Sequence, residues 1–180
     1  MRVITGSARG MRLRTLEGNS VRPTSEKVKE AVFSMLQFQL EGRRVIDLFA
    51  GCGQMGIEAL SRGAQSVCFV DSSQESVKTI RENLDATRLF ERAQVEKRDF
   101  KLFLSSCCQQ FDIAFLDPPY HNGFYDDALA LLAPLMSDYG IIVCEHPTDV
   151  SLPERVDDFR IAKQSRYGKI CISVYKRLEA

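Results

Sequence analysis

Apolar and polar positions alternate with two different periods along this chain, and the changes of period mark its elements. From residue 44 onward, short apolar runs alternate with segments whose apolar residues recur at helical spacing. The runs predict strands at 44–49, 67–71, 94–98, 112–117 and 140–146, and the segments between them predict helices near 54–62, 73–86, 100–109 and 124–135. Such alternation predicts a mostly parallel sheet with helices on both faces.

The two ends of the chain have different patterns. Residues 159–166 and 169–175 read as two strands around Tyr167-Gly168, which brings the predicted sheet to seven strands. At the N-terminus, two extended pieces flank the glycine-bounded loop 6–10, which predicts a small hairpin. This hairpin is too short to enclose a core, so we expect an extension of one domain.

Helix starts are predicted from capping residues. Thr24 or Ser25 can cap a helix that runs to about Gln39, with apolar residues at i, i+3, i+4 spacing. Ser72 with Glu75 predicts a capping box at the helix 73–86.

A glycine-rich turn follows the first strand of the alternating region. Gly51, Gly53 and Gly56 match G-x-G-x-x-G, and Asp71 ends the next strand. By spacing alone this is a dinucleotide fingerprint, in which glycines allow close approach and the acid binds a ribose hydroxyl. Asp47 favours S-adenosylmethionine instead, because a carboxylate four residues before the first glycine can face an amino-acid ammonium.

The tetrapeptide Asp117-Pro118-Pro119-Tyr120 follows the apolar strand 111–116. Its carboxylate and a proline-held carbonyl can accept the N–H groups of an exocyclic amine, and the Tyr120 ring can stack on the base. Two acceptors at one nitrogen suit methyl transfer, because that nitrogen becomes positive as it attacks. The alternative is a strand that ends in a turn, with Asp as a cap and Pro-Pro as a helix stop. A hydride-transfer enzyme has no need of this element, so the two motifs together favour a methyltransferase.

Together these motifs resemble the class I methyltransferases and, more narrowly, the RsmD-type 16S rRNA (guanine-N2)-methyltransferase family. The resemblance runs from Met1 to about Tyr175 and is carried by both motifs and by the segments 1–10, 22–24, 27–31 and 58–64. The chain departs from the family at Cys52, where Ser is usual, and at Lys169-Ile170, where Asp-Thr is common.

The resemblance implies a Rossmann-like fold with a reversed last strand, and methyl transfer from S-adenosyl-L-methionine to the N2 amine of one guanine in 16S rRNA. The family's substrate implies the assembled small ribosomal subunit as partner. The implied catalytic residues are Asp117, Pro118, Pro119 and Tyr120, with Arg166, Tyr167 and His121 as accessories at the rim. The implied cofactor-binding residues are Asp47, Phe49, Gly51, Gly53, Asp71, Ser72, Asp99 and Phe100. Among these, Asp71 would accept the ribose hydroxyls, and Asp99 with Phe100 would meet the adenine.

The charge distribution agrees with an RNA substrate. The net charge is zero, but residues 1–44 carry nine basic and four acidic side chains, which leaves the remainder at −5. A basic end facing phosphate explains this asymmetry, although a solvated charged face is the commoner origin of a charge run. The predicted RNA-binding residues are Arg9, Arg12, Arg14, Arg22, Thr24 and Lys27.

Composition narrows the class of protein further. A length of 180 residues fits one domain, here an extension at 1–24 and a catalytic core at 25–180. No apolar stretch approaches the roughly 18 residues of a membrane span, and the N-terminus lacks a signal peptide, so we expect a cytoplasmic enzyme. Six cysteines without a C-x-x-C pair, together with two histidines, predict no metal site. A monomer is the expected state.

Four alternatives remain open on the sequence. An N6-adenine DNA methyltransferase can use the same tetrapeptide, but the chain after the core is too short to read a duplex. A glutamine or small-molecule methyltransferase more often has Asn at position 117. A non-catalytic RNA-binding or ribosome assembly factor could retain the fold, and a dinucleotide oxidoreductase remains the most distant alternative.

Overall fold

The computed structural model describes residues 1–16, 26–119 and 123–177. Its centre is an eight-stranded sheet with the order β3-β2-β1-β4-β5-β8-β7-β6. The strands are β1 (Arg44–Leu48), β2 (Ser66–Asp71), β3 (Ala93–Lys97), β4 (Phe111–Leu116), β5 (Met136–Pro147), β6 (Arg155–Val156), β7 (Phe159–Tyr167) and β8 (Ile170–Arg177). β1 to β5 are mutually parallel, and β8 inserts antiparallel between β5 and β7.

The predicted fold class is confirmed, with one correction to the sheet. It has eight strands rather than seven, because the two-residue β6 pairs with the start of β7 at the edge. A strand of two residues has no periodicity to detect. The crossover order makes β1 and β4 the central neighbours, so the glycine-rich turn and the Asp-Pro-Pro segment follow adjacent strands.

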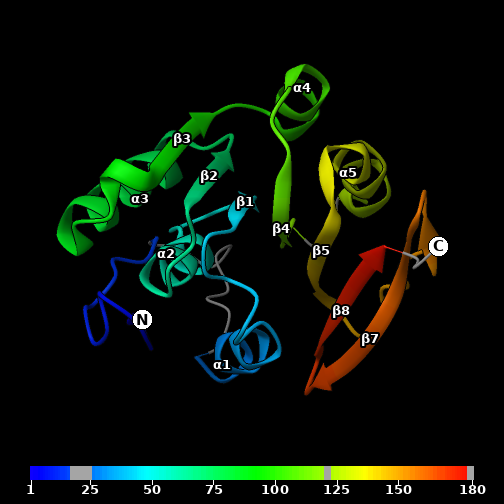
Figure 1. Ribbon diagram of the computed structural model, residues 1–180, viewed down its shortest axis with the longest axis horizontal. Coiled ribbons are helices and arrows are strands. Elements are labelled where there is room, and N and C mark those ends of the chain that lie inside the picture. The colour runs from blue at the N-terminus through cyan, green and yellow to red at the C-terminus, as the bar shows by residue number, and fades with distance from the viewer. Residues whose placement is uncertain (17–25, 120–122, 178–180) are drawn as a thin grey trace.

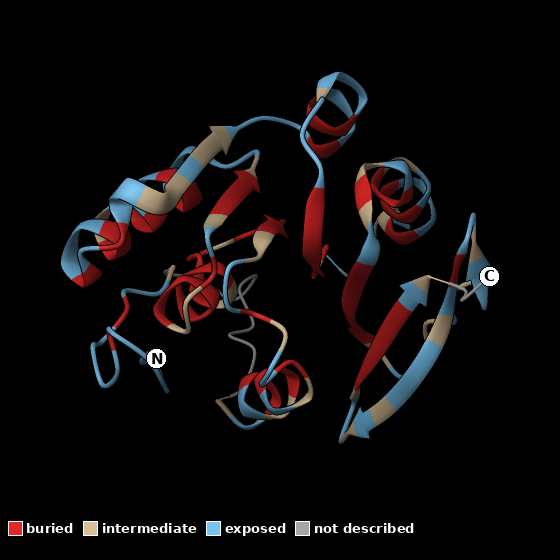
Figure 2. Ribbon diagram, viewed as in Figure 1, coloured by how far each residue is buried: buried red, intermediate tan, exposed pale blue. Residues whose placement is uncertain are grey.

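Helices cover both faces of the sheet (Figure 1). The helices are α1 (Glu26–Met35), α2 (Gln54–Ser61), α3 (Gln74–Thr87), α4 (Phe100–Ser106) and α5 (Phe124–Leu132), with 3-10 turns η1 (Phe90–Arg92) and η2 (Ala133–Leu135). One apolar cluster joins α1, α2 and α3 to the sheet, and a second joins α4 and α5 to its other face. The central strands are buried, whereas β3 and β7 expose much of their length (Figure 2).

Several predicted boundaries shift. α1 ends at Met35 and not at Gln39, and its predicted caps, Thr24 and Ser25, lie outside the described residues. α4 stops three residues earlier than predicted, at Ser106. α5 ends at Leu132 and continues as the 3-10 turn η2, which contains a proline.

The predicted capping box at α3 is wrong. Ser73, and not Ser72, is the cap, because its hydroxyl accepts the Ser76 N–H. The Ser73 N–H in turn donates to the Asp71 carboxylate at 2.9 Å, which turns the chain before the helix and delays its start by one residue.

The predicted N-terminal hairpin is present in a minimal form. Arg2 and Arg12 form an antiparallel bridge, and three backbone hydrogen bonds flank it. Val3, Ala8 and Leu13 are buried in the same cluster as α1 and α2, so the hairpin shares the core of the domain.

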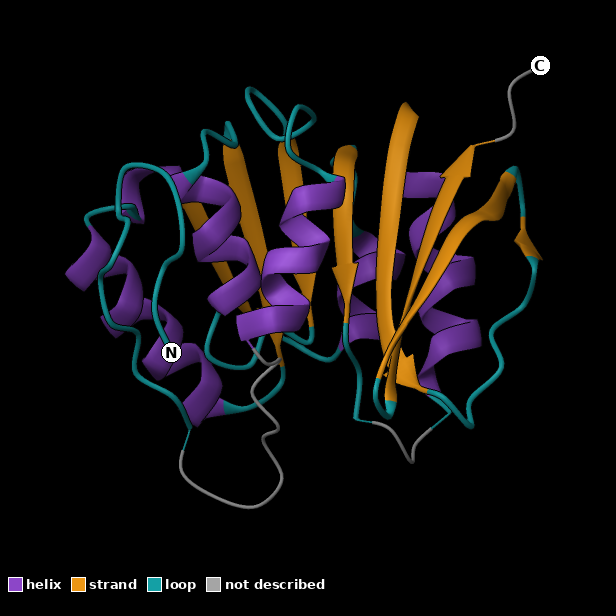
Figure 3. Cartoon of the chain, turned by 90° about the horizontal axis from the view of Figure 1, so that it is seen from below, coloured by secondary structure: helices purple, strands orange, loops and turns teal. Residues whose placement is uncertain are grey.

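The carboxyl ends of the parallel strands lie along one edge of the sheet, the lower edge in Figure 3. Ligands of such sheets bind outside this edge, where the strand order reverses. Among the described residues, no helix is both long and apolar enough to span a bilayer.

Candidate active site

The glycine-rich turn between β1 and α2 is shaped by left-handed backbone and close packing. Gly51 and Gly53 have φ angles of 56° and 78°. A Cβ on Gly56 would lie 2.3 Å from the ring of Phe69, so only glycine lets α2 pack this closely on β2. A Cβ on Gly51 would meet nothing within 4 Å, so the outer side of the turn is open.

Asp47 lies beneath this turn. It is 4% exposed, and its Oδ2 accepts the Gly56 N–H at 2.9 Å. Burial raises the pKa of Asp47 to about 7, the Gly56 hydrogen bond opposes the rise, and the Asp71 charge adds to it. A cation placed here would restore the charged form of Asp47.

A buried oxygen lies close to this turn in the chain. Gln54, the first residue of α2, is 7% exposed, and its Oε1 has no hydrogen-bond partner among the described residues. Buried polar atoms without partners are rare, and this one suits an N–H donor brought by a ligand. The sequence reasoning missed Gln54, and only its position directly after Gly53 could have indicated it.

Asp71 at the end of β2 holds the turn in place. Its Oδ2 accepts the Gly51 N–H at 2.9 Å, and its Oδ1 accepts the Ser73 N–H. A carboxylate has about four lone-pair sites, so both oxygens can also accept ribose hydroxyls. Ser72 is exposed beside it. Cofactor binding by these two residues stays a prediction.

Three aromatic rings gather around the ends of β1, α4 and α5. The Phe49 ring lies 4.9 Å from that of Phe100 and is stacked with that of Phe124 at 5.9 Å. Phe49 has a φ of 65°, an unusual backbone for a residue with a side chain. Asp99 caps α4 by accepting the Lys101 and Leu102 N–H groups. Asp99 and Phe100, the residues predicted to contact adenine, therefore lie beside a cluster of aromatic rings. Phe124 belongs to this cluster and was not among the predicted site residues.

Asp117 lies near two other acidic residues, Glu145 and Asp47, at the edge of the sheet where the parallel strands end. Burial, followed by the negative charges of Glu145 and Asp47, raises the pKa of Asp117 well above its ordinary value. Glu145 comes from the adjacent strand β5 and is 8% exposed. Asp117 is half-buried, Pro118 is buried and Pro119 is exposed. Tyr120 and His121 lie outside the described residues.

The structure therefore brings the two motifs together. Asp47 and Asp117 lie at the ends of adjacent strands and are close enough for their charges to interact. The sequence reasoning missed the role of Glu145, because its proximity to Asp117 depends on the pairing of β4 with β5. Among the described residues, no group of three or more His, Cys, Asp or Glu side chains is placed to hold a metal ion.

The predicted RNA-binding residues of the hairpin, Arg9, Arg12 and Arg14, are exposed, and so is Lys27 at the start of α1. Arg14 pairs with Glu82 of α3 at 2.8 Å. Arg22 and Thr24 lie outside the described residues.

Buried side chains fix the hairpin on the core. Glu58 of α2 is fully buried and accepts the Ile4 and Thr5 N–H groups at 2.8 and 3.0 Å. Its oxygens also lie 3.4 Å from Lys29 Nζ and 2.8 Å from Arg62 Nε. The hairpin is thereby held at a fixed position relative to the helix that starts at the glycine-rich turn.

The structure has the fold of the class I methyltransferases. A solved structure described as "Putative methyltransferase yhhF from Escherichia coli" superposes with a TM-score of 0.86 at 26% identity, over 100% of this chain and 99% of the other. The superposition spans the whole of this chain, so it includes the N-terminal hairpin and the reversed strand β8.

Sequence comparison narrows the class to a family. Residues 1–176 match the family described as "Conserved hypothetical protein 95", and the chain belongs to this RsmD-type family. A protein of Bacillus subtilis (strain 168) named "Putative rRNA methyltransferase YlbH" is 39% identical over 98% of this chain and 99% of its own length. "Ribosomal RNA small subunit methyltransferase D" of Haemophilus influenzae is 36% identical over 73% of this chain and 70% of its own. The resemblance to the RsmD-type family that the motifs indicate is confirmed.

Proposed function

We propose that this protein transfers a methyl group from S-adenosyl-L-methionine to the exocyclic N2 amine of a guanine in 16S rRNA, within the assembled small ribosomal subunit. One observation carries the proposal. Asp47 and Asp117 lie at the ends of adjacent strands, at the same edge of the sheet. Asp47 is the carboxylate predicted to bind the cofactor, and Asp117 is the one predicted to bind the amine. The names of the relatives support an rRNA substrate.

The residues of the turn fit the methionine end of the cofactor. Its ammonium would meet Asp47 and the Oε1 of Gln54, which no described residue contacts by a hydrogen bond, and both residues are buried and offer acceptors. Asp71 would accept the ribose hydroxyls, and the rings of Phe49 and Phe100 would border the adenine. When bound, the cofactor supplies an electrophilic sulfonium methyl.

Asp117 is proposed to hold the amine of the target base. In the free protein its raised pKa favours the neutral acid, and an N–H donor would stabilise the carboxylate. The amine becomes positive as it attacks, so a carboxylate within hydrogen-bond distance stabilises that charge. The Pro118 carbonyl would accept the second N–H and fix the direction of the lone pair. The proton of the amine can leave after transfer.

Alignment is expected to supply much of the rate. The N2 lone pair of guanine is drawn into the ring, so the amine is a weak nucleophile and gains most from being held in line. The base must leave its stack to reach the edge of the sheet, and an unpaired guanine does so at the least cost. Stacking on Tyr120 is expected to contribute about 1–3 kcal/mol.

The proposal is tested with labelled cofactor. Small subunits from a strain lacking the gene, and naked 16S rRNA as a second substrate, are incubated with wild type or with Asp117→Ala. We expect label in N2-methylguanosine with wild type only, and more of it in subunits than in naked RNA. Label in N6-methyladenosine would instead establish the adenine alternative. Cofactor binding without any transfer to either substrate would favour the non-catalytic assembly factor.

A further inference from the structure

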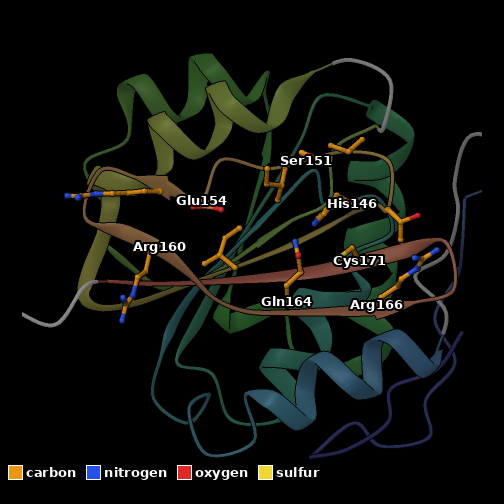
Figure 4. Close-up of a pocket in the computed structure, with 12 residues that line it drawn as sticks. His146, Ser151, Glu154, Arg160, Gln164, Arg166 and Cys171 are labelled. Carbon is orange, nitrogen blue, oxygen red and sulfur yellow. The ribbon is translucent and has the colours of Figure 1, made fainter.

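A cavity of about 890 Å³ lies against β7, β8 and the end of β5 (Figure 4). Its floor is formed by side chains of three strands, among them His146, Gln164 and Cys171, and its roof by the connection 148–154. α4 and α5 cover this face over β4 and β5, whereas among the described residues only that connection crosses it over β8 and β7. The cavity exists because no helix fills this position in the described part of the chain.

The walls of the cavity are fixed. The Thr148 N–H donates to the Lys169 carbonyl at 3.0 Å, and the Ile161 N–H donates to the Glu154 carbonyl at 3.0 Å. The Tyr175 hydroxyl donates to the Pro153 carbonyl at 2.7 Å. A preformed cavity of this kind binds a ligand without first having to order a loop.

The floor carries a directed chain of hydrogen bonds. Gln164 Nε2 donates to Ser173 Oγ at 2.9 Å, and Ser173 Oγ lies 2.8 Å from His146 Nε2. His146 Nδ1 lies 3.0 Å from the Pro147 carbonyl, so a neutral ring with its proton on Nδ1 satisfies every contact. Burial lowers the pKa of His146, which agrees with this form. The Gln164 amide is thereby oriented, with its oxygen and second N–H left for a ligand.

The rim of the cavity is basic. Arg155, Arg160 and Arg166 line it against a single acid, Glu154. Arg160 and Arg166 form no ion pair with any described residue, and Arg166 Nε donates only to the Gly168 carbonyl. The hairpin 159–177 contains six basic residues and no acidic one. Such a rim complements phosphate.

The register of the sheet connects the cavity to the proposed active site. Arg166 pairs with Cys171, and Cys171 pairs with His146, so these three side chains form one row across β7, β8 and β5. Leu116 pairs with Cys144, which places Pro118, two residues on, at the end of the same row. Three strand spacings separate Pro118 from Arg166, or about 14 Å. A single strand of RNA that leaves the active site can reach the cavity within a few nucleotides.

We propose that this cavity binds an unpaired RNA nucleotide next to the methylated guanine. Its base would lie on Gln164 and Cys171 of the floor, and the flanking phosphates would bind Arg160 and Arg166. The inference rests on the proposed function and extends it, because it places a second recognition surface on the face of the sheet opposite α1–α3. The basic N-terminal hairpin, which packs on that other face, would hold a different part of the RNA.

The first test measures the salt dependence of RNA binding. A fluorescent single-stranded RNA is titrated with wild type and with the double variant Arg160→Gln/Arg166→Gln, in a series of salt concentrations. The loss of two phosphate contacts is expected to lower the slope of log K against log salt by about 1.4. The matched control is Arg81→Gln/Arg88→Gln, within and directly after α3, where both side chains are exposed and lie on the other face. An unchanged slope in the double variant of the cavity would overturn the proposal.

Kinetics and cross-linking supply independent readouts. With small subunits as substrate, the cavity variant is expected to raise KM, because both arginines would bind phosphates of the RNA. A photo-crosslinking residue in place of the exposed Ser151 should attach to RNA within a few nucleotides of the modified guanine. Attachment to a ribosomal protein alone, or a fall in kcat without a change in KM, would contradict the proposal.

The two proposals fail in different ways. If wild type transfers no methyl group, the proposed function fails, and the salt slopes still decide whether the cavity binds RNA. If wild type methylates the subunit and the slopes of both double variants equal that of wild type, only the cavity proposal fails.

Discussion

Replacing Asp47 by asparagine is expected to change how the stability of the cofactor-free protein depends on pH. Asp47 is 4% exposed, and burial raises its pKa from 3.8 to about 7. The native state therefore holds a proton on Asp47 at pH values where the unfolded chain has released it. The contribution of this group to stability is greatest below pH 3.8, falls as the pH rises from there to about 7, and is constant above. The full loss is about 4 kcal/mol at about 1.36 kcal/mol per pKa unit.

The asparagine side chain of the Asp47→Asn variant does not titrate, so the difference between variant and wild type isolates this group. Between about pH 5 and pH 8, the free energy of unfolding of wild type should fall relative to that of Asp47→Asn by about 3 kcal/mol. The amide oxygen of the variant can still accept the Gly56 N–H, so the turn keeps its hydrogen bond. Urea unfolding across this pH range measures the difference, and Asp85→Asn, at an exposed position on α3, is the control. A difference that is constant over this range would refute the assigned burial and pKa of Asp47.

The same carboxylate links cofactor binding to protons. If the ammonium of the cofactor binds Asp47, binding at about pH 6 should release about 0.9 protons, since a group with a pKa near 7 is mostly protonated there. Calorimetry in buffers of different ionisation enthalpy counts these protons, and affinity should rise with pH up to about 7. Release of no proton would mean that the ammonium binds elsewhere.

Three further predictions concern other parts of the molecule. Asp117→Ala should abolish methyl transfer while cofactor affinity measured by calorimetry stays within a fewfold of wild type; undiminished transfer would remove Asp117 from the proposed mechanism. Glu58→Gln should destabilise the protein by about 3–5 kcal/mol in chemical unfolding, because it leaves Lys29 buried without its counter-charge; a change below about 1 kcal/mol would show that the charge of Lys29 does not depend on Glu58. Arg9→Ala with Arg12→Ala should weaken RNA binding and flatten its salt dependence, with a slope loss of about 0.7 for each phosphate contact removed; an unchanged slope would move the RNA surface away from the hairpin.

The sequence predicts the parallel core well because its strands are short apolar runs with helical segments between them. The last strand is also predicted, since Ile170, Ile172 and Val174 recur at every second position, and its reversed direction is implied by the family resemblance. β6 is not predictable, because its two residues pair only when β7 is in place. The cap of α3 is predicted at Ser72 but is Ser73, because the hydrogen bond from the Ser73 N–H to Asp71 decides which serine becomes the cap.

The sequence predicts those site residues that belong to local motifs and misses those that the fold brings together. Asp47 and Asp117 stand out in sequence because each accompanies a recognisable motif. Glu145 does not, and its influence on Asp117 arises from the pairing of β4 with β5. Glu58 looks like a solvated helix residue, yet it is fully buried because the hairpin packs over it. Partners that are distant along the chain cannot be inferred from local pattern.

Nucleoside analysis of 16S rRNA from a strain without this gene, complemented with wild type or with Asp117→Ala, tests the central claim most directly. The account predicts N2-methylguanosine at one position, lost in the deletion strain, restored by wild type and absent with Asp117→Ala. The account would be contradicted if the deletion strain kept every N2-methylguanosine of its 16S rRNA. It would also be contradicted if Asp117→Ala restored the lost one.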